Sequence, residues 1–425
     1  MNNFKKKNEF IILADVPPIP SEDRLIKYKE AGFNYYNLTE DYVVRDKENG
    51  GITDEYFKAI EDSHKLGLKV ILRTMRSNSP DYYDTVTDEF KGKADAFYFC
   101  DEPSFTPVSW YGSGPLPKLK KFVDWYNEHG GDAFFHINLL QSYGMWIVHG
   151  RQNTPNYEDY LDTYIETILK NVKGEKSLST DHYPIAFDTE GNNCIKESAI
   201  LDYYLIADRS KKLRAEGHDV RSGFCIQLTS DKGLFIREME CPADITFQVN
   251  FAMAFGAKLL EYYLYVGRNT GLIPDKETQL EYTPTYGWVK DANAWVHKLG
   301  KYILDYEWNS TKVMLGTEVK DEHNARAFDT VKRFQPEKFN LVKDFSGTAD
   351  CLVSEFTSDN GYAYMVVNYT EPTAGIKNTV TISFDGASKA KIVTNNGEQI
   401  VDLTDGIVSI SLGSGEGAFI IPKNS

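Results

Sequence analysis

Short apolar runs, rich in β-branched and aromatic residues, alternate with amphipathic stretches along the chain as far as Tyr265. The runs are apolar almost throughout, which is typical of strands buried on both faces of a parallel sheet, and the stretches between them have the period of helices. One run and one stretch together occupy about 32 residues, the length of a strand and its crossover helix. The pattern predicts eight strands, over Phe10–Val16, Phe33–Leu38, Lys69–Met75, Ala96–Cys100, Ala133–Leu140, Leu178–Ile185, Gly223–Leu228 and Ala257–Tyr265.

The ends of the predicted helices carry capping signals. Ser21 precedes the first helix as an N-cap, and Gly32 and Gly67 follow the first and second helices, where a left-handed residue ends a helix. Eight strand–helix units in succession predict a closed parallel (β/α)8 barrel, the TIM barrel. A doubly wound open sheet is the alternative, but the sequence has no glycine-rich dinucleotide fingerprint to support it. A last helix, about 287–304, completes the ring.

The pattern changes after about residue 308. Short alternating runs, separated by Gly, Asn, Asp and Ser turns, replace the helical period. Such runs predict an antiparallel β-sandwich over 309–425, which follows a barrel domain over 1–308. The sequence between them has no low-complexity linker, so we expect the two domains to pack closely.

The overall charge argues against polyanionic partners. Lys and Arg number 47 and Asp and Glu 62, a net charge of −15, so we expect neither nucleic acid nor a membrane surface as a partner. The 5 cysteines are widely spaced and form no C-x-x-C pair, which favours unpaired thiols in a reducing compartment. With no signal-peptide pattern and no apolar segment of about 20 residues, we expect a cytoplasmic protein.

Polar residues follow the predicted strands at the end where such barrels hold their active sites. They are Asp15, Asn37, Arg73, Asp101 with Glu102, His136 with Asn138, Asp181 with His182 and Tyr183, Gln227, and Glu261 with Tyr263 and Tyr265. The fourth strand gives the most specific signal, because Asp101 and Glu102 come directly after five apolar or aromatic residues. A carboxyl against apolar walls can acquire a raised pKa and act as a general acid. A structural interpretation instead has Asp101 capping a helix and Glu102 paired with an arginine.

The sequence Phe-Tyr-Phe-Cys-Asp-Glu-Pro at residues 97–103 resembles the fourth strand of the glycoside hydrolases that share the barrel of the β-galactosidases and cellulases. There the strand ends in Asn-Glu or Asp-Glu, often before proline, and the resemblance implies that Glu102 is the acid/base. The segments around Asn138, Thr180–Pro184 and Phe255–Tyr265 are similar to those of a group of bacterial glycosidases with a barrel and a small C-terminal β-domain. The expected activity is therefore hydrolysis of oligosaccharides or small glycosides, without an organic cofactor.

The seventh strand departs from that family. Retaining members carry a nucleophilic glutamate at its end, whereas this chain has Gln227, so a second carboxyl must come from elsewhere. Glu261 is the first candidate and Asp181 the second, and each could instead contact sugar hydroxyls or be structural. Glu238 and Glu240 stay open as candidates, as do a substrate-assisted mechanism and loss of activity.

Sugar recognition needs aromatic planes for the apolar ring faces and polar groups for the hydroxyls. The candidates for substrate binding are Asp15, Arg73, Asp101, Trp110, Asn138, His182, Tyr183, Gln227, Tyr263 and Tyr265. Any one aromatic could equally fill the core.

Other functions fit less well. His136, His182 and Asp181 could be drawn as a metal cluster but lack the helical spacing of a zinc hydrolase, so no metal is expected. The sequence lacks the G-x-S-x-G elbow of the serine esterases, so that activity is not expected. A metal-dependent isomerase would need a metal, and an aldolase-type enzyme would need a lysine at the end of a strand. Lys258 lies at the start of its strand, which disfavours this function. The main alternative is a carbohydrate-binding protein on a barrel that has lost catalysis, which Gln227 motivates.

Overall fold

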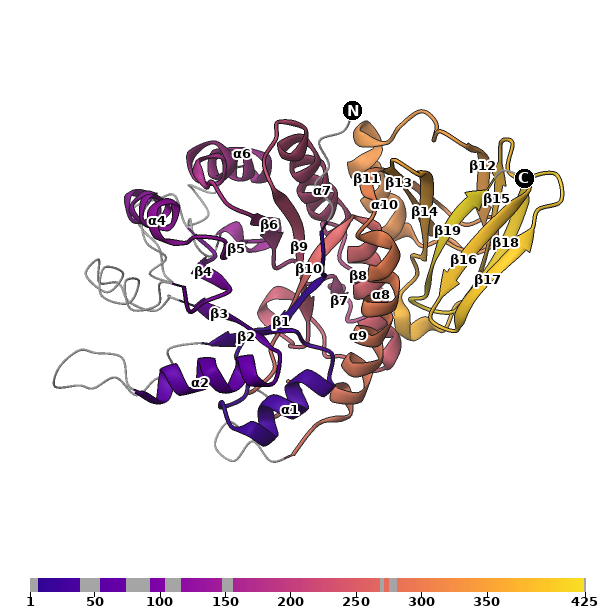
Figure 1. Ribbon diagram of the computed structural model, residues 1–425. Helices are drawn as coiled ribbons and strands as arrows, with labels where there is room; N and C mark the ends of the chain where they lie inside the picture. The colour runs from indigo at the N-terminus through magenta and orange to yellow at the C-terminus, as the bar shows by residue number, and fades with distance from the viewer. Residues whose placement is uncertain are drawn as a thin grey trace.

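The computed structural model describes residues 7–38, 54–73, 92–103, 116–146, 156–267, 271–274 and 281–423. Eight parallel strands form one sheet in the order β1-β10-β9-β6-β5-β4-β3-β2 (Figure 1). They are β1 (Ile11–Ala14), β2 (Tyr35–Leu38), β3 (Lys69–Arg73), β4 (Ala96–Asp101), β5 (Phe134–Leu139), β6 (Lys176–Thr180), β9 (Val220–Gln227) and β10 (Ala257–Tyr263). The predicted TIM barrel is confirmed.

Asn34, just before β2, closes the ring against β1. Its backbone N donates to the carbonyl of Ile12 at 3.0 Å, and its Oδ1 accepts from the Ile12 N at 2.8 Å. The Tyr28 hydroxyl adds a second link, because it accepts from the Ala14 N and donates to the Tyr35 carbonyl. The first and last strands of the sheet order therefore meet, and the barrel has no open edge.

In the described ranges seven helices surround the strands, and none of these helices is long and apolar enough to cross a membrane. Ser21 occupies the N-cap position of the first helix without a side-chain capping bond, whereas Gly32 and Gly67 have the expected positive φ. The predicted last helix is α9. The seven are α1 (Glu22–Glu30), α2 (Asp54–Lys65), α4 (Leu116–His129), α6 (Tyr157–Thr167), α7 (Ala199–Ala215), α8 (Pro242–Ala254) and α9 (Pro284–Ile303).

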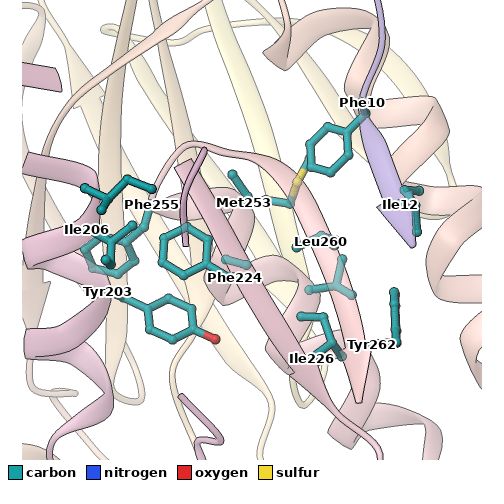
Figure 2. Packing of buried hydrophobic residues seen from close by; sticks show 14 of the residues in the cluster. Phe10, Ile12, Tyr203, Ile206, Phe224, Ile226, Met253, Phe255, Leu260 and Tyr262 are labelled. Carbon is teal, nitrogen blue, oxygen red and sulfur yellow. The ribbon is translucent and has the colours of Figure 1, made fainter. Parts of the chain in front are cut away.

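Large aromatic side chains fill the layer between these helices and the strands (Figure 2). Tyr203 of α7 stacks on Phe224 of β9 and on Phe251 of α8, with ring centroids 4.3 Å apart in each case. Along β10, Leu260 faces this layer, whereas Leu259 belongs to a separate cluster inside the barrel. Because strand side chains alternate, residue 261 also faces the interior.

Antiparallel strands after α9 form the predicted sandwich, at the right of Figure 1. A six-stranded sheet has the order β11-β13-β14-β19-β16-β17 and a three-stranded sheet the order β12-β15-β18. The strands are β11 (Glu307–Met314), β12 (Val342–Gly347), β13 (Cys351–Ser358), β14 (Gly361–Asn368), β15 (Asn378–Phe384), β16 (Lys389–Thr394), β17 (Gly397–Asp402), β18 (Ile407–Leu412) and β19 (Gly417–Lys423).

Two expectations about local structure were wrong. The helical period does not end at residue 308, because α10 (Glu322–Val331) buries Asn324, Ala327, Phe328 and Val331 on one face. The run Leu178–Ile185 is not one strand: β6 ends at Thr180, and β7 (Ile185–Phe187) pairs with β8 (Asn193–Ile195) as a hairpin. The polar segment 181–184 interrupts the apolar run, so the chain leaves the barrel there.

Helix α8 lies between the barrel strands and the sandwich (Figure 1) and is bonded to both sides. The Asn250 Nδ2 donates to the carbonyl of Gly415 in the sandwich at 2.8 Å, and its Oδ1 accepts from the Trp295 Nε1 of α9 at 2.8 Å. Phe247 and Phe251 of α8 contact the ring of Tyr369, with centroids 5.6 and 5.3 Å away. The expected close packing of the two parts is therefore observed.

Replacing Asn250 by alanine should lower the free energy of unfolding by about 2 to 4 kcal/mol, because the indole N–H of Trp295 and the carbonyl of Gly415 would be buried without partners. Urea unfolding measures the change. Thr246→Ala on the same helix is the control, since the Thr246 hydroxyl bonds only its own helix, at Pro242. Equal effects of the two substitutions would contradict the proposed importance of this contact.

Candidate active site

Acidic side chains gather where the parallel strands end, as the barrel geometry requires. Asp15 follows β1, Asp101 ends β4, Asp181 follows β6, and Glu261 lies in β10. Each is buried or half-buried. Water solvates these carboxyls poorly, so the charge of each depends on its neighbours.

Arg73, at the end of β3, joins two of the acids. Its Nη1 donates to Asp15 and its Nη2 donates to Asp101 Oδ2 at 2.6 Å. The Tyr98 hydroxyl donates to Asp101 Oδ1 at 2.9 Å, and the guanidinium carbon lies 4.7 Å from the centre of the Tyr98 ring. Burial raises the pKa of Asp15 to about 6, although Arg73 opposes the shift.

Glu261 forms a second group with His136 and Ser177. Its Oε2 lies 3.1 Å from the His136 Nε2, and the His136 Nδ1 lies 2.7 Å from the Ser177 Oγ. Burial, with the charge of Asp101, raises the pKa of Glu261 to about 8, and burial lowers the pKa of His136 to about 3. Both shifts favour the uncharged form of the group concerned.

Glu102 and Asp181 form the third group, and their side chains hydrogen-bond to each other. Burial raises the pKa of Glu102 to about 7, while the bond from Asp181 opposes the rise. Burial and the nearby charge of Glu102 hold the pKa of Asp181 well above its usual range. Two carboxyls in contact cannot both ionise readily, so the pair keeps a shared proton near neutral pH.

The backbone holds this pair at the strand ends. The Glu102 N donates to the carbonyl of Asn138 at 2.9 Å, and the Asp181 N donates to the carbonyl of Leu139 at 3.2 Å. Glu102 has a φ of +46°, a conformation that costs a side-chain-bearing residue about 1 to 2 kcal/mol. This left-handed backbone position comes directly after the last residue of β4.

Three of the predicted substrate ligands lie near these acids. Asn138 Oδ1 accepts from the Ser179 Oγ at 3.3 Å, inside the barrel. The rings of Tyr183 and Tyr263 stack with centroids 6.0 Å apart and planes inclined by 27°. They join the ends of β6 and β10 in an aromatic patch.

Other candidates are placed elsewhere. The side-chain amide of Gln227 is bonded to backbone groups, because its Nε2 donates to the carbonyls of Ile185, Thr229 and Arg237, and its Oε1 accepts from the Ile185 N. Tyr265 packs against Tyr28 and Phe33 in the layer beneath α1. Trp110 lies outside the described residues.

His182 also points away from the acids, toward α7. Its Nδ1 lies 2.6 Å from Asp202 Oδ2, and its ring contacts those of Tyr143 and Tyr203. The imagined cluster of His136, His182 and Asp181 therefore does not assemble. Within the described ranges, no three His, Cys, Asp or Glu side chains are arranged to hold a metal ion.

Sequence reasoning passed over Tyr98 and Cys225 and left His136 without a role. All three face the barrel interior: Tyr98 contacts Asp101, His136 contacts Glu261, and Cys225 is paired in register with Glu261. His136 lies two residues before Asn138 on β5, and this spacing was the available signal for it. Cys225 stands in the same relation to Gln227, but a lone thiol suggested no chemistry. Tyr98 lies three residues before Asp101, across a register shift in β4, so strand alternation gave no signal for it.

No family model matches this sequence, and no curated protein matches it. Solved structures share its fold. A family 39 glycoside hydrolase from the gut symbiont Bacteroides cellulosilyticus WH2 superposes with a TM-score of 0.53 at 13% identity, over 97% of this chain and 80% of that one. Alpha-galactosidase I from Mortierella vinacea superposes with a TM-score of 0.52 at 10% identity, over 100% of this chain and 99% of that one. A GH27 β-L-arabinopyranosidase from Geobacillus stearothermophilus superposes with a TM-score of 0.51 at 10% identity, over 98% of this chain and 96% of that one.

Replacing Glu261 by glutamine should stabilise the protein increasingly as the pH rises. The pKa of Glu261 is about 8 in the folded chain against an ordinary 4.5, so the wild type loses stability as the pH rises from about 4.5 to about 8, and glutamine does not titrate. Urea unfolding at pH 5 and pH 8 measures the difference. Glu238→Gln, at an exposed position, is the control; a pH-independent difference for Glu261→Gln would contradict the prediction.

Proposed function

We propose that this protein is a glycoside hydrolase in which Glu102 is the general acid/base, acting as the acid when the glycosidic bond breaks. The observation that carries the proposal is the hydrogen-bonded pair of carboxyls, Glu102 and Asp181, at the ends of β4 and β6. A general acid needs a proton at the working pH, and the raised pKa of Glu102, about 7, supplies one. The fold shared with three proteins named as glycosidases supports the same activity.

Glu102 would protonate the glycosidic oxygen as the bond to the sugar breaks. Its hydrogen bond with Asp181 keeps the proton in the pair until a substrate oxygen takes the place of the Asp181 carboxyl. The carboxyl groups must then separate, since hydrolysis with retention needs about 5 to 5.5 Å between them and inversion about 6.5 to 9.5 Å. Entry of a sugar between the two strand ends would provide that separation.

Asp181 is the better second carboxylate of the two that we considered. Its side chain hydrogen-bonds to that of Glu102, whereas the Glu261 carboxyl contacts His136. We assign Asp181 the attack on the sugar carbon, either directly or by activating water. When the substrate separates the pair, the one shared proton stays on Glu102 and leaves Asp181 as the carboxylate that this role needs. Glu261, whose raised pKa favours the uncharged carboxyl, would stay bonded to His136 and outside the chemical step.

The substrate would be a carbohydrate that lies against the Tyr183–Tyr263 patch. Stacked phenol rings suit the apolar face of a pyranose, and Asn138 and Asp101 can bond its hydroxyls. Asp15 and Arg73 would hold Asp101 in place. Hydrolysis by a carboxyl pair needs no organic cofactor.

Glu102→Gln should lower kcat/KM on 4-nitrophenyl glycosides by about 10²- to 10⁴-fold, the usual contribution of general acid catalysis. The loss should be much smaller on 2,4-dinitrophenyl glycosides, because their leaving group departs without a proton. Steady-state assays on matched α- and β-anomers measure both. Glu238→Gln should behave as the wild type. An equal loss on both leaving groups would contradict the acid role.

Asp181→Asn should lower turnover on both leaving groups by about 10² or more, whereas Glu261→Gln should change it by less than about tenfold. The wild-type kcat/KM should fall as the pH rises through about 7, where Glu102 loses its proton. Sugar binding that survives all three substitutions, without turnover of any glycoside by the wild type, would instead support a carbohydrate-binding protein.

A further inference from the structure

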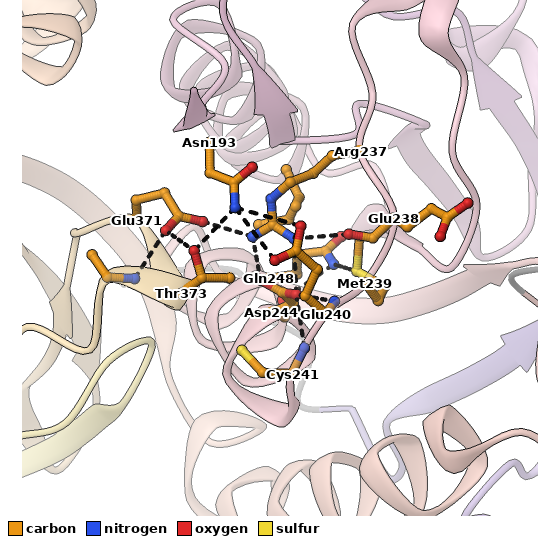
Figure 3. A network of polar contacts seen from close by, with 12 residues as sticks. Asn193, Arg237, Glu238, Met239, Glu240, Cys241, Asp244, Gln248, Glu371 and Thr373 are labelled. Carbon is orange, nitrogen blue, oxygen red and sulfur yellow. Dashed lines mark hydrogen bonds and ion pairs between the residues drawn. The ribbon is translucent and has the colours of Figure 1, made fainter. Parts of the chain in front are cut away.

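Arg237 is buried between the barrel and the sandwich and bonded to carboxylates on both sides (Figure 3). Its Nη2 donates to Asp244 Oδ1 of α8 at 2.6 Å and to Glu371 Oε1 of the sandwich at 2.6 Å. Its Nη1 donates to Asp244 Oδ2 at 3.0 Å. Two carboxylates with well-placed hydrogen bonds compensate the buried guanidinium, and removal of one leaves the other in place.

The backbone of Arg237 continues this contact toward the candidate active site. Its carbonyl accepts from the Gln227 Nε2 at 2.8 Å, and its N donates to the carbonyl of Ile185 at 3.3 Å. Gln227 also bonds both backbone groups of Ile185, each at 3.2 Å. Ile185 begins β7 and follows Asp181 by a single short turn of chain. The segment that carries Asp181 is thus tied, through Gln227 and Arg237, to Glu371.

The sandwich side of the contact is itself held firmly. Glu371 Oε2 accepts from the Ala374 N at 3.0 Å and from the Thr373 hydroxyl at 2.5 Å, in the short helix η6 (Pro372–Ala374). Thr373 also accepts a bond from the Asn193 Nδ2 of β8 at 3.1 Å. Both strands of the β7–β8 hairpin are therefore linked to this corner of the sandwich, one directly and one through Arg237.

We propose that Glu371 is a positioning residue: through Arg237 and Gln227, the sandwich fixes the chain between β6 and β7 and so holds the Asp181 carboxyl against Glu102. The inference rests on the proposed function, in which Asp181 acts in the chemical step. It assigns the sandwich a part in catalysis without contact between any sandwich residue and the substrate. A small displacement of a reacting group is costly, because rates depend steeply on its alignment.

Glu371→Gln in the full chain tests this, with Glu307→Gln as the matched control. Glu307 also pairs across the two parts, with Arg214, and the side chains of both pairs are at most 12% exposed. Arg214 donates to the carbonyl of Val220, at the start of β9 and so at the end of the barrel remote from the acids. The two substitutions remove comparable contacts at opposite ends of the barrel.

We expect Glu371→Gln to lower kcat by about 10- to 100-fold with KM nearly unchanged, and Glu307→Gln to change neither, although both lower the melting temperature. Thr373→Val, a milder change at the same corner, should lower kcat in the same direction. Glu371→Asp keeps a carboxylate on a side chain one methylene shorter, so it should retain part of the kcat that Glu371→Gln loses. Equal kinetics in Glu371→Gln and Glu307→Gln at matched stability would overturn the proposal.

Amide hydrogen exchange gives an answer that does not depend on activity. Glu371→Gln should speed exchange in peptides covering 181–187 and 227–237, and Glu307→Gln should not. Unchanged exchange there would overturn the positioning role even if the wild type hydrolyses glycosides. A wild type that hydrolyses no glycoside would overturn the proposed function, and the exchange result would still decide whether Glu371 orders the Asp181 segment.

Discussion

The burial of several carboxyls around Arg73 is the constraint on which the site depends. The guanidinium bonds Asp15 and Asp101 directly, and its positive charge also lowers the pKa of Glu102 and of Glu261. Desolvation outweighs this effect and raises the pKa of both carboxyls, so each holds its proton to a higher pH than an exposed carboxyl would. The site therefore holds two kinds of acid. Asp15 and Asp101 are paired with Arg73, whereas burial favours the protonated form of Glu102 and Glu261.

Barrel geometry brings these groups together, and the sandwich supports one of them. Parallel strands deliver their last residues to the same rim, and the alternation of side chains selects which of them face inward. The hairpin after β6 leaves that rim and is bonded to the segment around Arg237 and to the corner of the sandwich at Thr373. The position of Asp181 therefore depends on contacts made far from it in the sequence.

Much of the fold could be predicted from the sequence, because hydrophobic periodicity and helix-ending glycines report local structure. All eight barrel strands, the last helix and the antiparallel character of the C-terminal strands are present. Helix α10 was missed because it lies within a run of strands, and the β7–β8 hairpin because its first strand continues the apolar run of β6. The candidate site could be predicted only as a set of strand ends. Pairing of Glu102 with Asp181, and of His136 with Glu261, depends on strand tilt and burial, which no periodicity encodes. Gln227 shows the same limit: a polar residue at a strand end proved to be bonded to backbone throughout.

The most direct test of this account is the titration of the Glu102 carboxyl itself, followed by carbon-13 NMR of glutamate-labelled protein and assigned by the resonance lost in Glu102→Gln. The account predicts a midpoint near pH 7 in the wild type, and a shift in Asp181→Asn, because the partner carboxyl is then replaced by an amide. A midpoint near the ordinary 4.5, unaffected by the change at Asp181, would show that the two carboxyls do not share a proton and would contradict the central claim.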